Sequence, residues 1–409
     1  MSRYSPSVSA TRATAPVLLL AALAGCSVPG GGSDSADAKE GPSFTVAAAG
    51  DVLIHPQLTE QGRKDAAAGG DSTGKKIDFR PLLAGVKPVI SKADLAICHF
   101  EPVAGKPQGP FQGFPDFVVP PQITTALKDV GYDTCSTASN HTLDHGAPGV
   151  RRTLDALDEA GLKHTGSARS SAEAAKPLIM DVKGVKVAQL SYAFGFNGRD
   201  VPADKPWLTN QTDFKRIAAA EKAARKAGSE VVILSIHWGR EHHPDPSNGQ
   251  LKLARKLARE TGINLVIGHH AHVVQPMEKI GSTWVAYGLG NQVARHDVPS
   301  GLTEEGVIGW FEFHKRGDNW DVDARYVPTL LTIPPDSGTD TDTGGAQDAD
   351  AAVVKDHRLV DLAGSLQNAE DLPAAERARY RMAFQRTQGT LLNRGAVEDG
   401  LKPLKDLPE

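Results

Sequence analysis

The sequence has no surplus of basic residues: 45 Lys and Arg stand against 49 Asp and Glu, and the formal net charge is −4. Nucleic-acid binding is therefore not expected, because neutralising phosphates requires a cationic surface. It also lacks an apolar run of the roughly 20 residues that a membrane-spanning helix needs. What remains, 409 residues of which 40% are hydrophobic, is enough for one large or two modest globular domains.

Cysteine is scarce as well, with three in the chain. Cys98 and Cys135 both lie inside apolar, strand-like runs. In an exported protein they form either a disulfide or two buried free thiols, and the sequence leaves both open.

The third cysteine, Cys26, belongs to a leader. Arg3 and Arg12 precede the apolar stretch "APVLLLAALAGC", which is too short to span a bilayer and is typical of a signal peptide. Leu23-Ala24-Gly25-Cys26 resembles a bacterial lipoprotein processing site, so residues 1–25 are expected to be removed and Cys26 lipidated. Residues 26–43 are rich in Gly, Ser and Asp and predict a flexible tether to the outer face of the cell membrane.

Apolar strand-like runs alternate with helix-like segments from residue 44 to residue 333. This alternation predicts one α/β domain, with added antiparallel strands near its end. Residues 334–352 are acidic and low in complexity, which indicates a linker. Residues 353–409 have helical spacing and predict a small helical appendage, whose role the pattern does not indicate.

Polar residues stand where the strand-like runs end. In one sheet they would converge on a single edge, the usual ligand site of an open α/β sheet. The set is Asp51, Glu101, Asn140, His141, His237, His270 and His272. Carboxylate, amide and imidazole together favour Mn, Fe or Zn over a thiolate-bound structural zinc, and a His-x-His pair can offer one imidazole to each of two ions.

Each of these residues alone is a weak signal. Asp51 after a glycine is more often a turn or helix cap, and Asn140-His141 is more often loop structure. His237 before a tryptophan is equally compatible with a core histidine. The same placement at five successive strand ends is what favours a site with two divalent ions.

Six segments, in order, resemble the CapA family, which is named for poly-γ-glutamate capsule synthesis. They are "AAAGDVLI", "DLAICHFE", "PPQITTALKDVGYDTCSTASNHTLDHG", "SYAFGFNG", "ILSIHWGREHHP" and "INLVIGHHAHVVQPMEKIGSTWVAYGLGN", within residues 44–330. The family is similar to calcineurin-like metallophosphoesterases, and this resemblance implies a four-layer α/β/β/α sandwich with a two-metal centre.

The resemblance also implies a role for each strand-end residue. Asp51 matches the aspartate of the first motif, Glu101 the bridging carboxylate and Asn140 the ligand asparagine. His237 and His270 would then serve the second ion and His272 the first. His141 matches the histidine that assists the leaving group.

The sequence departs from the pattern at the first ion. Leu53 stands where phosphoesterases place a histidine, and His55 either compensates or faces solvent. His99 is either an extra ligand or a hydrogen-bonding substitute for an asparagine. Asp144 either orients His141 or caps the helix that begins near Ala147. Histidines 242, 243 and 269 are expected outside the ligand set, and Glu241 and Asn291 are expected to line the pocket.

Two functions stay open. The first is an exported, lipid-anchored hydrolase-like protein that cleaves a phosphoester or a γ-glutamyl amide in poly-γ-glutamate or another anionic envelope polymer. The second is a non-enzymatic metal-binding component of a membrane complex that assembles or exports the polymer. A solute-binding lipoprotein would need two similar lobes, and the sequence shows one set of chemistry-bearing strand ends.

Overall fold

In a computed structural model of the chain, the structure describes residues 41–72, 74, 76–298, 300–334 and 354–404. The predicted signal peptide, the lipidation site Cys26 and nearly all of the tether lie outside these residues, as does nearly all of the acidic linker. In the part of the chain that is described, no helix is both long and apolar enough to cross a membrane.

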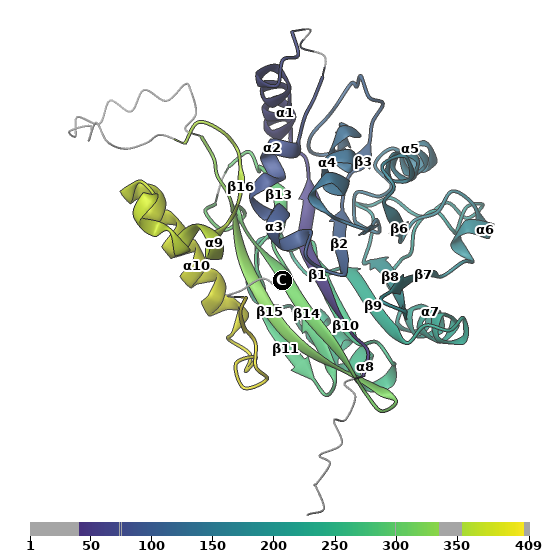
Figure 1. The fold of residues 1–409 in the computed structure, drawn as a ribbon. Helices are drawn as coiled ribbons and strands as arrows, with labels where there is room; N and C mark the ends of the chain where they lie inside the picture. The colour runs from purple at the N-terminus through teal and green to yellow at the C-terminus, as the bar shows by residue number, and fades with distance from the viewer. Residues whose placement is uncertain (1–40, 73, 75, 299, 335–353, 405–409) are drawn as a thin grey trace, which may run out of the picture. The chain divides into compact units, whose positions relative to one another are not determined.

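Two sheets form the centre of the domain (Figure 1). The nine-stranded sheet has the order β16-β15-β14-β1-β2-β5-β6, with β13 beside β1 and β17 beside β15. Its strands are β1 (Ser43–Leu53), β2 (Leu95–Phe100), β5 (Thr134–Ser136), β6 (Lys163–Thr165), β13 (Asn291–Ala294), β14 (Glu305–Arg316), β15 (Asn319–Leu331), β16 (Leu359–Asp361) and β17 (Lys402–Pro403).

The second sheet has six strands in the order β11-β12-β10-β9-β8-β7. They are β7 (Leu178–Val182), β8 (Val185–Ala193), β9 (Val231–His237), β10 (Leu265–His269), β11 (Met277–Ile280) and β12 (Thr283–Ala286). A separate two-stranded ladder joins β3 (Val103–Ala104) to β4 (Val118–Val119).

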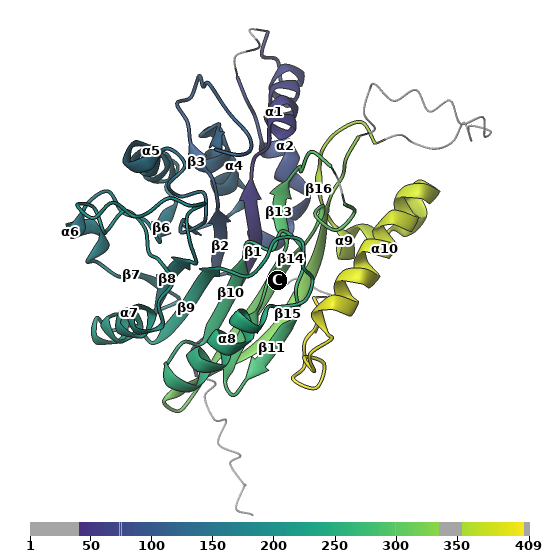
Figure 2. The same cartoon turned by 180° about the vertical axis from the view of Figure 1, so that it is seen from behind.

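The helices lie mostly outside the two sheets (Figure 2). They are α1 (Pro56–Ala68), α2 (Arg80–Leu83), α3 (Lys87–Ile90), α4 (Gln122–Val130), α5 (Gly146–Glu159), α6 (Ser171–Ala174), α7 (Phe214–Lys226), α8 (Asn248–Glu260), α9 (Leu362–Gln367) and α10 (Ala374–Leu391), with 3-10 turns at Ala84–Val86 and Ala369–Asp371. Sequence signals set some boundaries: the Ser247 side chain and Gln250 form a reciprocal capping box that starts α8.

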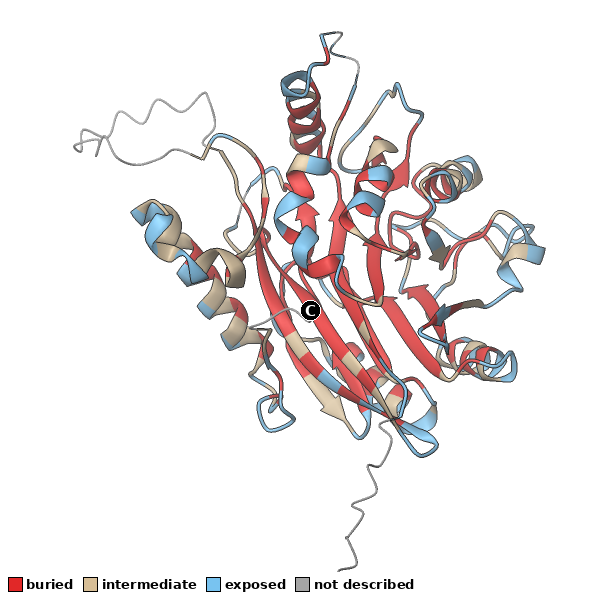
Figure 3. Cartoon of the chain, viewed as in Figure 1, coloured by how far each residue is buried: buried red, intermediate tan, exposed pale blue. Residues whose placement is uncertain are grey.

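Side-chain alternation along the strands produces the layers. On β9, Val231 and Ile233 pack in the core between the two sheets, whereas Val232 and Leu234 pack in the core shared with α7 and α8. The other face of β1 and β2 packs against α1 to α5. The central strands are buried along almost their whole length (Figure 3). The predicted α/β fold with α/β/β/α layers is therefore confirmed.

Two local expectations are also settled. The predicted turn at Lys183-Gly184 joins β7 to β8, and both residues have positive φ, 49° and 81°, as a two-residue hairpin turn requires. Cys98 and Cys135 are paired neighbours on β2 and β5 and form a disulfide, so the disulfide alternative holds.

Two expectations differ from the structure. The tail after residue 353 is not only helical, because β16 and β17 extend the nine-stranded sheet beside β15. The strand-end residues also do not share one sheet. Residues at the ends of β1, β2 and β5 belong to the nine-stranded sheet, and those at the ends of β9 and β10 to the six-stranded one. They meet because the parallel strands of both stacked sheets end on the same side of the domain.

Candidate metal centre

Asp51 lies near the end of β1, where a bulge follows it, and its side chain is 1% exposed. Its Oδ1 lies 3.0 Å from His269 Nδ1, and its Oδ2 accepts a hydrogen bond of 2.9 Å from the backbone N–H of His270. Oδ2 also lies 3.4 Å from His272 Nδ1. Burial raises the pKa of Asp51, while the nearby histidines oppose the rise. These contacts fix the carboxylate toward the end of β10.

Glu101 follows β2 and is fully buried. Within the described part of the chain, neither of its carboxylate oxygens has a hydrogen-bond partner, although Oε1 lies 3.6 Å from His272 Nε2 and 3.9 Å from His237 Nε2. Burial and the nearby Asp51 raise the pKa of Glu101 well above its usual value. Burying a carboxylate without a hydrogen-bond donor costs free energy. A bound cation would offset this cost, so the two oxygens of Glu101 are suited to bind one.

His270 and His272 follow β10 in a left-handed backbone conformation, with φ of 88° and 54°. Non-glycine residues rarely adopt it, and such residues cluster at functional sites. The conformation turns both imidazoles into the site rather than along the strand. Gly268 allows the end of β10 to lie close to the backbone of Tyr287, because a Cβ on residue 268 would stand 1.9 Å from the Tyr287 carbonyl oxygen.

His237 ends β9, and its two ring nitrogens have different partners. Nδ1 lies 3.0 Å from His99 Nε2, and His99 Nδ1 lies 2.8 Å from the Ser136 hydroxyl. Nε2 lies 2.9 Å from Asn140 Oδ1. An imidazole nitrogen and an amide oxygen are both ligands that divalent metal ions accept, so His237 and Asn140 would be able to hold one ion together.

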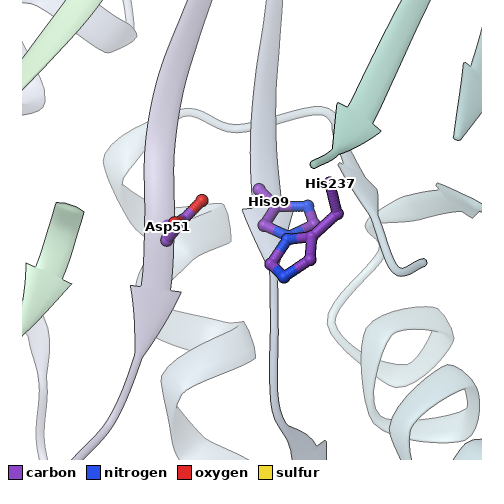
Figure 4. A group of neighbouring side chains, drawn as sticks. All are labelled: Asp51, His99 and His237. Carbon is purple, nitrogen blue, oxygen red and sulfur yellow. The ribbon is translucent and has the colours of Figure 1, made fainter. Parts of the chain in front are cut away.

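Figure 4 shows Asp51, His99 and His237 reaching toward one another from β1, β2 and β9. His99 is thus a hydrogen-bonding partner of His237, as one of the two expectations had it, and it stands close enough to Asp51 to be a ligand as well. His269 bonds Asp51 and stacks on His99 with ring centroids 3.9 Å apart.

Among the residues that the structure describes, three sets of side chains have ligand atoms within 4.8 Å of one another: Asp51, Glu101 and His272; Asp51, His99 and His237; and Glu241, His270 and His272. The first set contains the residues expected at the first ion and the bridging position. Burial lowers the pKa of His270 and His272 to about 4 and the pKa of His237 well below its usual value. Neutral imidazoles and buried carboxylates together fit divalent metal ions.

His141 is separate from these sets and forms a dyad with Asp144. Its Nδ1 lies 2.6 Å from Asp144 Oδ2, which also accepts a bond from the backbone N–H of Phe117. The residue that precedes α5 is His145, with no side-chain cap. Asp144 therefore orients His141 and does not cap the helix. Arg199 pairs with the other oxygen of Asp144 at 3.4 Å and with Asp116 at 2.6 Å.

Two histidines near Leu53, His55 and His296, lie close together, which the sequence pattern did not predict. His55 is buried, contrary to the solvent-facing alternative, and its Nδ1 contacts the Leu53 carbonyl and the Arg295 backbone N–H. His296, which the sequence reasoning missed, has its ring centroid 5.0 Å from that of His55 and 5.1 Å from that of His272. Its position five residues after Asn291 was the available signal.

The mouth of the site carries further residues from loops. Glu241 follows β9 and is half-exposed, with Oε1 3.9 Å from the buried, unpartnered Nδ1 of His270. Phe194 follows β8, is 47% exposed, and stands 4.7 Å from the His270 ring. Asn197 lies within hydrogen-bonding distance of both Asn140 and His141. The Phe194–Arg199 stretch thus forms one wall of the site.

The chain matches a family model described as bacterial capsule synthesis protein over residues 45–296. It is 30% identical over 207 residues to capsule biosynthesis protein CapA of Bacillus anthracis, covering 50% of this chain and 49% of that protein. It is 30% identical over 168 residues to the PGA biosynthesis protein CapA of Bacillus subtilis, covering 41% of this chain and 44% of that protein. A probable polyglutamine synthesis accessory protein of Mycobacterium tuberculosis is 28% identical over 184 residues, covering 42% of this chain and 48% of that protein.

The chain thus spans about half the length of the curated relatives it matches. Among solved structures, it is similar to a calcineurin-like phosphoesterase of Bacillus subtilis, at 16% identity and a TM-score of 0.38, covering 70% of this chain and 91% of that one. An NAD nucleotidase of Haemophilus influenzae gives 10% identity and a TM-score of 0.42, covering 85% and 63%.

Proposed function

The chain belongs to the bacterial capsule synthesis protein family, and from this premise we propose that it is a metal-dependent hydrolase of the cell envelope. Its substrate would be poly-γ-glutamate or a similar anionic polymer, and the bond cleaved a γ-glutamyl amide or a phosphoester. The observation that carries the proposal is Glu101: a fully buried carboxylate that has no hydrogen-bond donor among the residues the structure describes and that lies among imidazoles whose pKa values are lowered.

The chain's own residues would divide the binding of two divalent ions. Asp51 and His272 would hold the first, with Glu101 shared between both ions. Asn140, His237 and His270 would hold the second. Ions of this kind supply Lewis-acid polarisation of the scissile group and a water of lowered pKa.

The His141–Asp144 dyad would supply the proton. Hydrolysis adds water across the scissile bond, so the leaving oxygen or nitrogen must gain a proton as the bond breaks. Asp144 accepts the Nδ1–H of His141 and so fixes the ring orientation, which would leave Nε2 to carry and release the proton. The ring of Phe117, with its centroid 4.8 Å from that of the His141 ring, packs edge-on against the imidazole and helps to hold it in place.

The cellular location is part of the proposal. The signal-like leader and Cys26 would place the domain outside the cytoplasm, tethered to the outer face of the membrane by a lipid. The curated relatives from Bacillus named for capsule or PGA biosynthesis support an envelope role. A membrane complex that synthesises or exports the polymer is the partner we would expect there.

The test combines metal content and turnover. Purified protein is assayed for Mn, Fe and Zn by mass spectrometry and for hydrolysis of a phosphodiester reporter and of poly-γ-glutamate. His270→Ala should lose metal and turnover together, whereas His141→Ala should keep its metal and lose turnover. His314→Ala is the matched control, because His314 lies on β14 beside Glu312 and Asp323, outside the site.

The outcomes separate the two functions left open by the sequence. Metal loss in His270→Ala with turnover in the wild type supports the hydrolase. Bound metal with no turnover on either substrate overturns the hydrolase for both bonds and favours a metal-binding component of an assembly complex. Wild-type protein that binds no divalent metal overturns both.

A further inference from the structure

Asn291, at the start of β13, orients the candidate ligand His272. Its Oδ1 lies 2.9 Å from His272 Nδ1 and so accepts that N–H, which leaves Nε2 as the nitrogen facing Glu101. Its Nδ2 donates to the His272 carbonyl at 3.2 Å. Such outer partners fix the tautomer and ring orientation of a metal-binding histidine.

Asn291 is itself held by the segment that leads into β14. Its Nδ2 also donates to the carbonyl of Thr303 at 2.8 Å. The backbones of Asn291 and Gly306 are in close contact, since a Cβ on Gly306 would stand 2.1 Å from the Asn291 carbonyl oxygen. The position of Asn291 therefore depends on where residues 301–306 lie.

Helix α10 of the tail forms ion pairs and hydrogen bonds with this same segment. Glu305 is buried, with its side chain 3% exposed, and Arg379 donates to its Oε1 at 2.6 Å while Arg386 donates to its Oε2 at 2.9 Å. Both arginines also donate to the carbonyl of Gly301. The views in Figures 1 and 2 agree in placing α10 beside β15.

We propose that Arg379 and Arg386 are positioning residues for the metal centre, acting through Glu305, residues 301–303 and Asn291 on His272. The inference rests on the proposed metal centre and adds a role for the tail, which lies outside the segment that matches the family model, residues 45–296. A continuous series of hydrogen bonds and short covalent stretches links the guanidinium groups to the ligand imidazole.

The arrangement is suited to such a role for two reasons. Each arginine binds both the Glu305 carboxylate and the Gly301 carbonyl. The pair therefore fixes the backbone of residues 301–305 and also neutralises the buried charge of Glu305. A buried carboxylate that lost both partners would leave its place or disturb its surroundings. Either movement would reach the Thr303 carbonyl, two residues away.

The test is Co²⁺ binding to the full chain, followed by the visible absorption of the bound ion and by competition with a chelator. The variants are Arg379→Ala/Arg386→Ala, its Lys/Lys counterpart, and Arg394→Ala as control. Arg394 forms a similar tail-to-body ion pair, 3.0 Å from Glu278 on β11, but does not touch residues 301–306. The melting temperature of each variant is measured in chelator, to record stability separately.

The double alanine variant should bind Co²⁺ about tenfold more weakly at the His272 site and show an altered absorption spectrum, the size expected when an outer partner of a ligand is lost. Lys/Lys should recover part of the affinity, and Arg394→Ala should lose stability without any change in Co²⁺ affinity or spectrum. If the double alanine variant does not fold, Glu305→Gln, which keeps the side chain's shape but removes its charge, is measured in its place.

A double variant that is less stable but has wild-type affinity and spectrum overturns the positioning role and leaves the metal centre standing. Equal loss of affinity in Arg394→Ala also overturns it, since any loosening of the tail would then suffice. Absence of Co²⁺ binding in the wild type overturns the metal centre itself, and this inference with it.

Discussion

Replacing Glu101 by Gln should have opposite effects on stability and on metal binding. Glu101 is fully buried, and among the described residues neither of its oxygens has a hydrogen-bond donor. Leaving a buried polar group unsatisfied costs about 1–3 kcal/mol, and more when it is charged. Glutamine has nearly the same shape and no charge, so the variant should be more stable than the wild type by about 1–3 kcal/mol in chelator at pH 7.

The direction of the pKa shift of Glu101 predicts the same sign for the change in stability. Burial raises the pKa of Glu101 in the folded state above its unfolded value, so the folded state binds the proton more tightly. The folding contribution of this group is therefore most favourable below the unfolded pKa and is lost as the pH rises toward the folded pKa. The advantage of Glu101→Gln should accordingly be small near pH 4 and grow toward neutral pH.

The assay is thermal unfolding in chelator and with added Mn²⁺ or Zn²⁺. For a chain of this size, 1–3 kcal/mol corresponds to roughly 1–4 °C in melting temperature. Added metal should stabilise the wild type and leave Glu101→Gln unchanged. Glu221→Gln is the contrasting control, because Glu221 is buried but paired with Arg225 at 3.2 Å, so its loss of charge should lower stability. A Glu101→Gln variant that is destabilised in chelator, or that binds metal as the wild type does, would refute the reasoning.

Three further predictions follow from the site and the fold. His141→Ala should lower turnover by about 10²- to 10⁴-fold with unchanged metal content, measured as kcat beside elemental analysis; a parallel loss of metal would show that His141 is a ligand instead. The disulfide closes a separation of 37 residues, so Cys98→Ser/Cys135→Ser should cost about 4 kcal/mol in urea unfolding, and an unchanged midpoint would argue against the bond in solution. Gly268→Ala should displace the end of β10 from Tyr287 and lower both melting temperature and metal content. Gly249→Ala on α8, where an added Cβ meets only the Ser247 hydroxyl at 3.8 Å, should leave metal content unchanged and should not lower the melting temperature.

The sequence predicted most of the site because its residues stand at strand ends, a position that pattern alone reveals. Asp51, Glu101, Asn140, His237, His270 and His272 could be selected in this way, and the structure brings them together from two sheets. That two sheets contribute could not follow from the alternation of strands and helices alone, since alternation does not assign strands to sheets. The prediction of four α/β/β/α layers came from the resemblance to the CapA family.

Other features depend on contacts between residues distant in sequence. His269 and Asp51 are 218 positions apart, so nothing in either segment shows that one bonds the other. His296 lies in a loop, where no periodicity predicts the direction of its side chain, whereas Glu241, also in a loop, is expected at the pocket only because its segment resembles the family. The ion pairs of α10 with Glu305 join residues 74 and 81 positions apart, and the helical spacing of the tail gives no sign of a partner.

The most direct test of the account is a crystal structure of the protein grown with Mn²⁺ or Zn²⁺, with anomalous diffraction recorded at the metal's absorption edge. We expect one anomalous peak in contact with Asp51, Glu101 and His272, and a second bounded by Asn140, His237 and His270. Peaks elsewhere, or no peak with Glu101 still unpartnered, would contradict the metal centre on which the proposed function depends.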